Sequence, residues 1–183
     1  MNNVFEYYIS CEIFKEILES VEYLHSCDPP VIHRDLKPDN ILISVNITSN
    51  RCVKLCDFSL ATDHNTDRHT ASRYGHTSCV GTLAYMAPEL LSGSVYNHLS
   101  DIYSLSIIGQ KLFGIDLQAS QTIEAKDSVI KKPILCLFEI LEKMMSTPRW
   151  RQRPDCQQVL ATHNEWSIDK TVVINDMDFI KYR

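Results

Sequence analysis

Glycine is scarce in this sequence of 183 residues: there are five glycines, and the first is Gly75. A glycine-rich loop that cradles phosphate groups is therefore excluded from everything that precedes Gly75. An excess of positive charge is missing too, because 18 lysines and arginines face 23 aspartates and glutamates, for a formal net charge of −5. This balance argues against a nucleic-acid binder or a protein of anionic membrane surfaces, both of which carry a basic patch.

Long apolar runs and paired cysteines are missing as well. The longest apolar runs, 83–87 and 134–138, are far shorter than the ~20 residues that a membrane-spanning helix needs. No basic flank with an apolar core follows Met1, so we expect no secretory signal. The seven cysteines are odd in number and include no CxxC pair, which indicates a reducing setting without disulfides. We therefore expect a cytoplasmic protein, with the nucleus as the alternative, and neither a membrane nor a nucleic-acid partner.

Apolar residues at helical spacing are what the sequence has in quantity. A stripe of isoleucine, leucine and valine predicts a first helix at 8–25, which the two prolines at 29–30 end. The segment 101–113 is apolar almost all round and predicts a buried central helix. Two later helices are predicted to start at Pro133 and near Asp155, since proline suits a first helical turn and aspartate suits an N-cap.

Short extended segments lie between the first two helices. Branched residues predict strands at 31–33, 41–45 and 51–56, and the polar turn between the last two indicates a hairpin. The polar stretch 63–78 has no periodicity and is predicted to be a long loop. The sequence therefore predicts a mainly α fold with one small β-hairpin.

Residues 33–40 have the sequence HRDLKPDN, which resembles the catalytic loop of eukaryotic protein kinases, HRDLKxxN. Further segments resemble the other motifs of that family in the same order: DFS at 57–59, GTLAYMAPE at 81–89, SDIYS at 100–104 and an arginine at 153. Five ordered motifs make a chance match negligible. The chain is therefore identified as a member of this family, of the serine/threonine type.

The fold that this resemblance implies is a protein-kinase-like large lobe with the small β-hairpin next to the catalytic loop. We expect this C-terminal lobe, a partial kinase domain, to occupy 1–165, and we leave 166–183 as an unassigned tail. The glycine-rich lid and the VAIK-type lysine of the family's small lobe have no counterpart in the sequence. We therefore expect weak ATP binding by this chain alone, and an exposed apolar face where a small lobe would pack.

The activity that the resemblance implies is transfer of the ATP γ-phosphate to a serine or threonine hydroxyl of a protein, with ATP and Mg²⁺ as cofactors. Asp35 is expected to orient the incoming hydroxyl, and Lys37 to contact the transferred phosphate. Asn40 and Asp57 supply the hard oxygen ligands that Mg²⁺ prefers. Lys37, followed by proline, together with Thr82 favours serine and threonine over tyrosine as the acceptor.

Other motif residues have architectural roles in the family. By resemblance, His33 is a packed side chain that supports the catalytic loop, and Thr82 bonds the catalytic aspartate and lysine. Asp101 is expected to accept hydrogen bonds from the backbone of the same loop. Glu89 and Arg153 resemble a buried ion pair that joins the segment ending in APE to the late helices.

Regulation and one departure from the family pattern concern the segment after the hairpin. Arg34 resembles the arginine that pairs with a phosphorylated activation loop, and Thr77 and Ser78 are the first candidate phosphosites. Ser59 takes the place of the glycine in the family's DFG triplet. We expect serine to adopt the positive φ that glycine tolerates there only with strain.

Two functions compete at this stage. The first is a protein kinase, whose partners are ATP and a protein substrate. The second is a pseudokinase or regulatory module, whose partner is a regulatory protein or a separate small lobe. The intact motif residues favour the first, and Ser59 and the missing lobe favour the second. A helical domain unrelated to kinases has almost no support.

Overall fold

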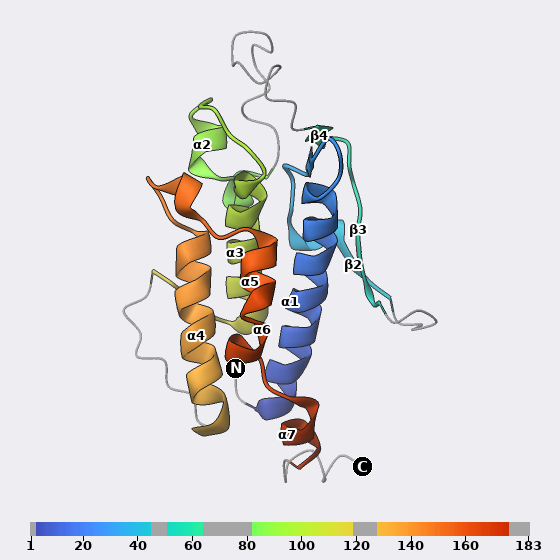
Figure 1. Ribbon diagram of the computed structural model, residues 1–183, viewed down its shortest axis with the longest axis vertical. Coiled ribbons are helices and arrows are strands. Elements are labelled where there is room, and N and C mark those ends of the chain that lie inside the picture. Colours follow the sequence, from blue (N-terminus) through green and yellow to red (C-terminus); the bar gives the residue numbers. More distant parts are fainter. Residues whose placement is uncertain (1–2, 45–50, 64–81, 119–127, 176–183) are drawn as a thin grey trace.

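The structure, a computed structural model, describes residues 3–44, 51–63, 82–118 and 128–175. Helices form most of this part, as the sequence predicts (Figure 1). None of the helices in these ranges combines the length and the hydropathy of a membrane span. The long helices are α1 (Val4–His25), α3 (Leu99–Phe113) and α4 (Ser128–Met144); the short ones are α2 (Pro88–Leu91), α5 (Cys156–Ala161), α6 (His163–Trp166) and α7 (Lys170–Ile174); the 3-10 turns are η1 (Pro38–Asn40), η3 (Leu83–Tyr85) and η4 (Trp150–Gln152).

The first helix, α1, begins earlier than the apolar stripe predicts. Asn3 caps it, because the Asn3 side chain accepts a hydrogen bond from the backbone N–H of Glu6 at 2.7 Å. Its buried face includes Tyr7, Phe14 and Val21, which follow one another at intervals of two helical turns. This stripe makes α1 one wall of the core.

The predicted central helix, α3, lies between α1 and α4 (Figure 1). Ile102 and Leu105 are fully buried, and the core continues on both sides of the helix. Gly109 allows α4 to come close, because a Cβ atom at this position would lie 2.7 Å from Cδ2 of Leu141. Gly114 then ends α3 in the left-handed conformation, with φ 62°.

The predicted start of the next helix at Pro133 is wrong. Helix α4 begins at Ser128, and Pro133 lies inside it. Ile130 and Ile134 are both buried and form one stripe across this position. Burial of that stripe draws the preceding turn into the helix, since tertiary packing supplies most of the stability of a helix. A proline this close to the start removes a single intrahelical hydrogen bond.

The predicted hairpin is present but shorter than expected. Strand β2 (Ile41–Ile43) pairs antiparallel with β3 (Val53–Leu55), in a register that sets Ile41 opposite Leu55. A second pair, β1 (Val31–Ile32) with β4 (Thr62–Asp63), brackets the hairpin in sequence, and β4 was not predicted. Glu16 of α1 accepts the backbone N–H groups of Cys52 at 2.7 Å and Val53 at 2.9 Å. These bonds fix the hairpin on α1.

The C-terminal elements close the core. Asp155 caps α5 as predicted, because its carboxylate accepts the Gln158 N–H at 2.8 Å while the Gln158 side chain accepts the Asp155 N–H at 3.1 Å. The segment that the sequence left unassigned folds back on α1. Trp166 is fully buried, and its carbonyl accepts the hydroxyl of Tyr7 at 2.6 Å. Val173 of α7 is buried in the same core.

Candidate active site

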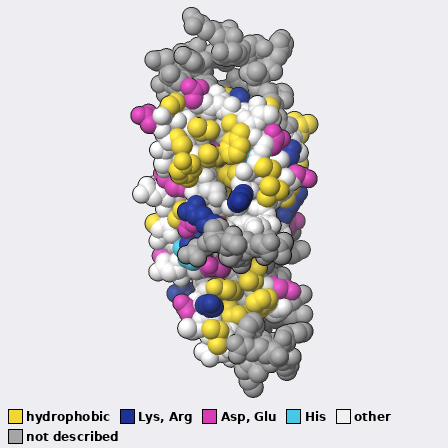
Figure 2. All heavy atoms as spheres, turned by 90° about the vertical axis from the view of Figure 1, so that its right-hand side faces the viewer, with side chains coloured by type: hydrophobic (Ala, Val, Ile, Leu, Met, Phe, Trp, Pro, Cys, Tyr) yellow, Lys and Arg dark blue, Asp and Glu magenta, His cyan; other side chains and the backbone are white. Residues whose placement is uncertain are grey.

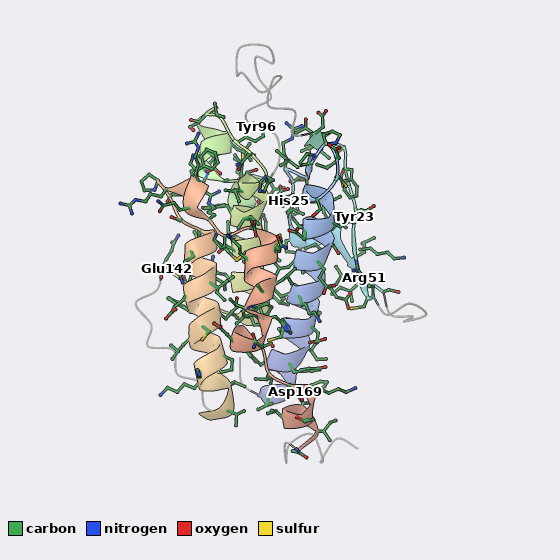
Figure 3. The ribbon with its side chains drawn as sticks, viewed as in Figure 1. Tyr23, His25, Arg51, Tyr96, Glu142 and Asp169 are labelled. Atoms are coloured by element: carbon green, nitrogen blue, oxygen red, sulfur yellow. The ribbon has the colours of Figure 1, made fainter. Side chains whose placement is uncertain are left out.

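Asp101, a buried carboxylate on α3, binds the backbone of the loop 33–40. Asp101 accepts the backbone N–H of His33 through Oδ2 and that of Arg34 through Oδ1, each at 2.9 Å. His25 at the end of α1 contacts Oδ2 of Asp101 through Nε2 at 3.0 Å, and Figure 3 shows His25 at the end of α1 that lies beside α3. Burial raises the pKa of Asp101, but the bonds from His25, His33 and Arg34 outweigh it, so the pKa lies below its ordinary value. The start of the loop is therefore hydrogen-bonded to a carboxylate that is ionised at neutral pH.

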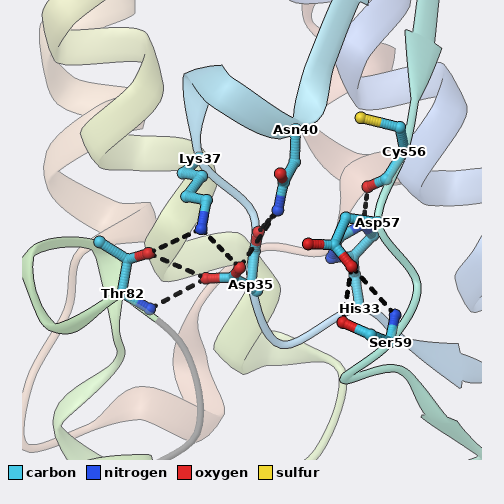
Figure 4. Close-up of polar contacts among 8 residues, drawn as sticks. All are labelled: His33, Asp35, Lys37, Asn40, Cys56, Asp57, Ser59 and Thr82. Carbon is cyan, nitrogen blue, oxygen red and sulfur yellow. Dashed lines mark hydrogen bonds and ion pairs between the residues drawn. The ribbon is translucent and has the colours of Figure 1, made fainter.

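Asp35, Lys37 and Thr82 form a closed polar network (Figure 4). Lys37 Nζ donates to Oδ2 of Asp35 at 2.8 Å and to the hydroxyl oxygen of Thr82 at 3.0 Å. Thr82 in turn donates to Oδ1 of Asp35, from its N–H at 2.9 Å and from its hydroxyl at 3.1 Å. Burial raises the pKa of Asp35, but the hydrogen bonds from Lys37 and Thr82 lower it by more. The pKa of Asp35 therefore lies below its usual range. Asp35 is therefore a carboxylate at neutral pH.

Asn40 completes the coordination of Asp35. Its Nδ2 donates to the carbonyl of Asp35 at 2.8 Å and to Oδ2 at 3.2 Å. Each oxygen of the Asp35 carboxylate thus accepts two hydrogen bonds, one pair from Thr82 and the other from Lys37 and Asn40. The amide nitrogen of Asn40 is bonded to Asp35, while the side-chain oxygen has no hydrogen-bond donor among the described residues.

The hairpin brings Asp57 to the same end of the fold as Asn40. The carbonyl of Asn40 accepts the N–H of Cys56 at 3.0 Å, which continues the β2–β3 pairing by one step and leaves Asp57 as the next residue. Asp57 is exposed and has φ 59°. Its Oδ1 accepts the hydroxyl of Ser59 at 2.6 Å and the Ser59 N–H at 3.3 Å. The Ser59 hydroxyl, followed by its N–H, lowers the pKa of Asp57.

The strain expected at Ser59 is not found. Among the described residues other than glycine, positive φ occurs at Arg34 (67°) and Asp57 (59°). Ser59 therefore sits in an ordinary backbone conformation, and the turn is made at Asp57 instead. Aspartate adopts the left-handed region more readily than most residues. Because this conformation falls on Asp57, Ser59 does not need the positive φ that would strain a serine.

The donor set fits a cation that arrives with a phosphate-bearing ligand. No group of three His, Cys, Asp or Glu side chains in the described residues could hold a metal ion alone. Asp57 and Asn40 offer one carboxylate and one amide oxygen at the end of the hairpin. Mg²⁺ commonly binds in this way, through one or two carboxylates, with waters and substrate phosphates as the other ligands.

His33 and Phe58 belong to the scaffold of the loop. His33 is fully buried, and its Nε2 lies 3.2 Å from the carbonyl oxygen of Cys56. The rings of His33 and Phe58 are in contact, with their centroids 5.0 Å apart and their planes tilted by 52°. These contacts tie the loop 33–40 to the segment that carries Asp57, and they leave His33 no access to a substrate.

Arg34 has partners that sequence reasoning missed. Its Nε donates to the carbonyl of Leu60 at 2.5 Å, and its Nη1 donates to the hydroxyl of Tyr96 at 3.1 Å. The candidate phosphosites Thr77 and Ser78 lie outside the described residues. No sequence pattern pointed to Tyr96 or to His25, because Tyr96 bonds Arg34 across 62 positions and His25 acts on the loop through Asp101, 76 positions away.

Glu89 and Arg153 form a buried ion pair with two hydrogen bonds. Nη1 of Arg153 lies 2.6 Å from Oε1 of Glu89, and Nη2 lies 2.9 Å from Oε2. Arg153 also donates to the carbonyls of Leu99 at 2.9 Å and Ser146 at 3.1 Å. The guanidinium lies over the ring of Tyr103, 5.1 Å from its centroid. One arginine thus joins α2, α3 and the segment after α4.

Large hydrophobic side chains are exposed beside the site. Figure 2 shows hydrophobic groups gathered on the face that α1 and the β2–β3 hairpin form. The exposed ones on these elements and next to them include Tyr23, Leu42, Ile43 and Phe58. An exposed apolar face of this kind is predicted from the sequence.

Comparisons with known proteins agree with the geometry. The family model of the protein kinase domain matches residues 2–170. The "Interferon-induced, double-stranded RNA-activated protein kinase" of Rattus norvegicus is 33% identical over 162 residues, which are 85% of this chain and 29% of that protein. The "Eukaryotic translation initiation factor 2-alpha kinase 1" of Mus musculus is 40% identical over 111 residues, 57% of this chain and 17% of that protein.

A plant relative matches the chain as well. The "Probable serine/threonine-protein kinase WNK9" of Oryza sativa subsp. japonica is 48% identical over 92 residues, 50% of this chain and 19% of that protein. The chain thus spans less than a third of the length of each of these relatives. Because the family model covers nearly the whole chain, and Thr82 and Asp101 of the later motifs bond the loop 33–40, the chain belongs to the eukaryotic protein kinase family.

Proposed function

We propose that the chain is the large lobe of a serine/threonine protein kinase, which transfers the γ-phosphoryl group of ATP to a serine or threonine hydroxyl of a protein. The network of Asp35, Lys37 and Thr82 is the observation that carries this proposal. Phosphoryl transfer asks an enzyme mainly for positioning and for charge neutralisation. The network offers an anion for the incoming hydroxyl and a cation for the phosphoryl group, held within hydrogen-bond distance of each other.

Asp35 would receive the substrate hydroxyl as a hydrogen-bond acceptor. Both of its oxygens are fully used by Thr82, Lys37 and Asn40, so the hydroxyl has to replace one of these donors. The longest of the bonds run from Asn40 at 3.2 Å and from the Thr82 hydroxyl at 3.1 Å. We expect the substrate to take one of these two places, while Lys37 and the Thr82 N–H keep the carboxylate oriented.

Lys37 would meet the transferred phosphoryl group. The hydrogen bond that Lys37 donates to Asp35 raises the pKa of Lys37, so the ammonium stays charged. The Lys37 side chain is half-buried, with 21% of its surface exposed, and we expect its Nζ to turn from Asp35 toward a phosphate oxygen when the nucleotide binds. Asn40 and Asp57 would hold Mg²⁺ together with the nucleotide. When bound, Mg²⁺ supplies the charge that neutralises the phosphate oxygens.

The acceptor specificity and the control of the site are part of the same proposal. The Thr82 hydroxyl, bonded to both Lys37 and Asp35, supports a serine/threonine acceptor, as does the name of the plant relative.

We propose Thr77 and Ser78 as phosphosites. A phosphate on either would compete with Tyr96 and Leu60 for the Arg34 guanidinium, because an arginine–phosphate pair is charge-assisted.

A binding module without activity is the second candidate. Two observations favour it: Ser59 stands where the family has glycine, and the hydrophobic side chains beside the site are exposed. A module of this kind would keep the fold and the apolar face. Its function would not require the four hydrogen bonds that the Asp35 carboxylate accepts.

Nucleotide binding and phosphoryl transfer separate the two candidates. We expect Mg-ATP to raise the melting temperature of the chain, and the Asp57→Asn variant to lose this shift. Glu142→Gln is the matched control, since it removes one exposed carboxylate on α4 away from the site (Figure 3). Transfer of labelled phosphate to serine- and threonine-containing peptides should fall by about 10²–10⁴-fold in Asp35→Asn. No shift at millimolar Mg-ATP, or no transfer by the wild type above the background of Asp35→Asn, would favour the binding module.

A further inference from the structure

The serine that replaces the family's glycine makes a direct bond to the candidate metal ligand. The hydroxyl of Ser59 donates to Oδ1 of Asp57 at 2.6 Å, and its N–H points to the same oxygen at 3.3 Å. A distance of 2.6 Å lies in the range of charge-assisted O–H···O⁻ bonds, which are about twice as strong as neutral ones. A glycine at this position could supply the N–H but not the hydroxyl.

The bond divides the two oxygens of the Asp57 carboxylate. Oδ1 is turned toward Ser59, and Oδ2 accepts no hydrogen bond from any residue that the structure describes. In Figure 4 the second oxygen points to the side on which Asn40 and Asp35 lie. The nitrogen of the Asn40 side chain is bonded to Asp35, and its oxygen accepts no hydrogen bond from a described residue. Oδ2 of Asp57 and the side-chain oxygen of Asn40 therefore lie at the same end of the hairpin, and no described residue donates a hydrogen bond to either.

We propose that Ser59 is a positioning residue, whose hydroxyl orients the Asp57 carboxylate so that Oδ2 is presented with Asn40 to a divalent cation bound with a nucleoside triphosphate. This inference rests on the proposed function. Asp57 is exposed, and no described residue other than Ser59 donates a hydrogen bond to its carboxylate. Groups that hydrogen-bond to metal ligands typically affect metal affinity by about 10–100-fold when they are removed. The hydrogen bond from the Ser59 hydroxyl therefore limits the side-chain rotation of Asp57, the exposed candidate ligand.

The test measures metal binding itself. Mn²⁺ is titrated into the chain in the presence of a non-hydrolysable ATP analogue, and free Mn²⁺ is followed by its electron paramagnetic resonance signal. We expect Ser59→Ala and Ser59→Gly to weaken Mn²⁺ binding by on the order of tenfold. Ser59→Thr keeps the hydroxyl and has room for the added methyl group at an exposed position, so it should bind as the wild type does.

Melting without metal and a ligand variant serve as controls. Because Ser59 is exposed, its variants should melt at the wild-type temperature when no metal is present, so a loss of Mn²⁺ affinity cannot come from unfolding. Asp57→Asn should bind Mn²⁺ more weakly than any Ser59 variant.

The outcomes distinguish this inference from the proposed function. Wild-type affinity in Ser59→Ala, with a loss in Asp57→Asn, overturns the role of Ser59 and leaves the proposed function standing. Tighter binding by Ser59→Ala, or an equal loss in Ser59→Thr, overturns it too, since the hydroxyl would then not assist the ligand. Failure of the wild type to take up Mn²⁺ with the nucleotide overturns both.

Discussion

Removing one half of the buried Glu89–Arg153 pair should destabilise the chain far more than removing half of an exposed pair. Glu89→Gln keeps the size of the side chain and removes the charge that faces Arg153. In the wild type the two side chains are 0% (Arg153) and 4% (Glu89) exposed, and two bonds of 2.6 and 2.9 Å join them. The guanidinium cannot give up its proton, so in the variant it remains a buried cation without an anion.

The magnitude follows from what Arg153 keeps. Losing one partner of a buried ion pair costs about 3–5 kcal/mol of unfolding free energy. The carbonyls of Leu99 and Ser146 still accept from the guanidinium in the variant. We therefore expect the lower end, about 3 kcal/mol. At about 2–4 °C per kcal/mol for a domain of this size, the melting temperature should fall by roughly 6–12 °C.

Urea unfolding of matched variants tests this reasoning. The control is Glu19→Gln, which removes half of the pair with Arg51, where the atoms lie 3.7 Å apart and the side chains are 62% and 32% exposed. An exposed pair contributes less than about 1 kcal/mol. The double variant Glu89→Met with Arg153→Met should recover much of the loss, because it leaves no buried charge. Equal losses for Glu89→Gln and Glu19→Gln would refute the argument.

Two further predictions concern buried hydrogen bonds. Tyr7→Phe removes the hydroxyl that reaches the Trp166 carbonyl at 2.6 Å and should lower the unfolding free energy in urea by about 1–3 kcal/mol. Tyr23→Phe, on a side chain that is 71% exposed, should stay within about 0.5 kcal/mol of the wild type, and a similar loss in both would contradict the assignment. The pKa of Asp101 lies below its ordinary value because the bonds from its partners, His25 among them, outweigh burial. Asp101 therefore contributes stability that is fully present above the unfolded pKa near ~4 and is lost as the pH falls through the folded pKa, so Asp101→Asn should flatten the acid limb of stability measured by circular dichroism.

Elements with a strong local pattern could be predicted. The helices α1 and α3 follow from apolar spacing, and the N-cap of α5 at Asp155 follows from its residue type. The start of α4 could not be predicted from Pro133, because the burial of Ile130 against the core outweighs the preference of proline for a first turn. The division of the chain at residue 165 stays a prediction.

The sequence by itself determined which residues form the candidate site, because the motif 33–40 and the later motifs occur in a fixed order along the chain. Only the tertiary structure decided how these residues are held. His25 reaches Asp101 across 76 positions and Arg34 reaches Tyr96 across 62, and no local pattern encodes a contact over such a distance. Ser59 is the sharpest case, since its residue type suggested strain, and the fold instead places the left-handed turn at Asp57 and leaves the serine hydroxyl free to bond the carboxylate.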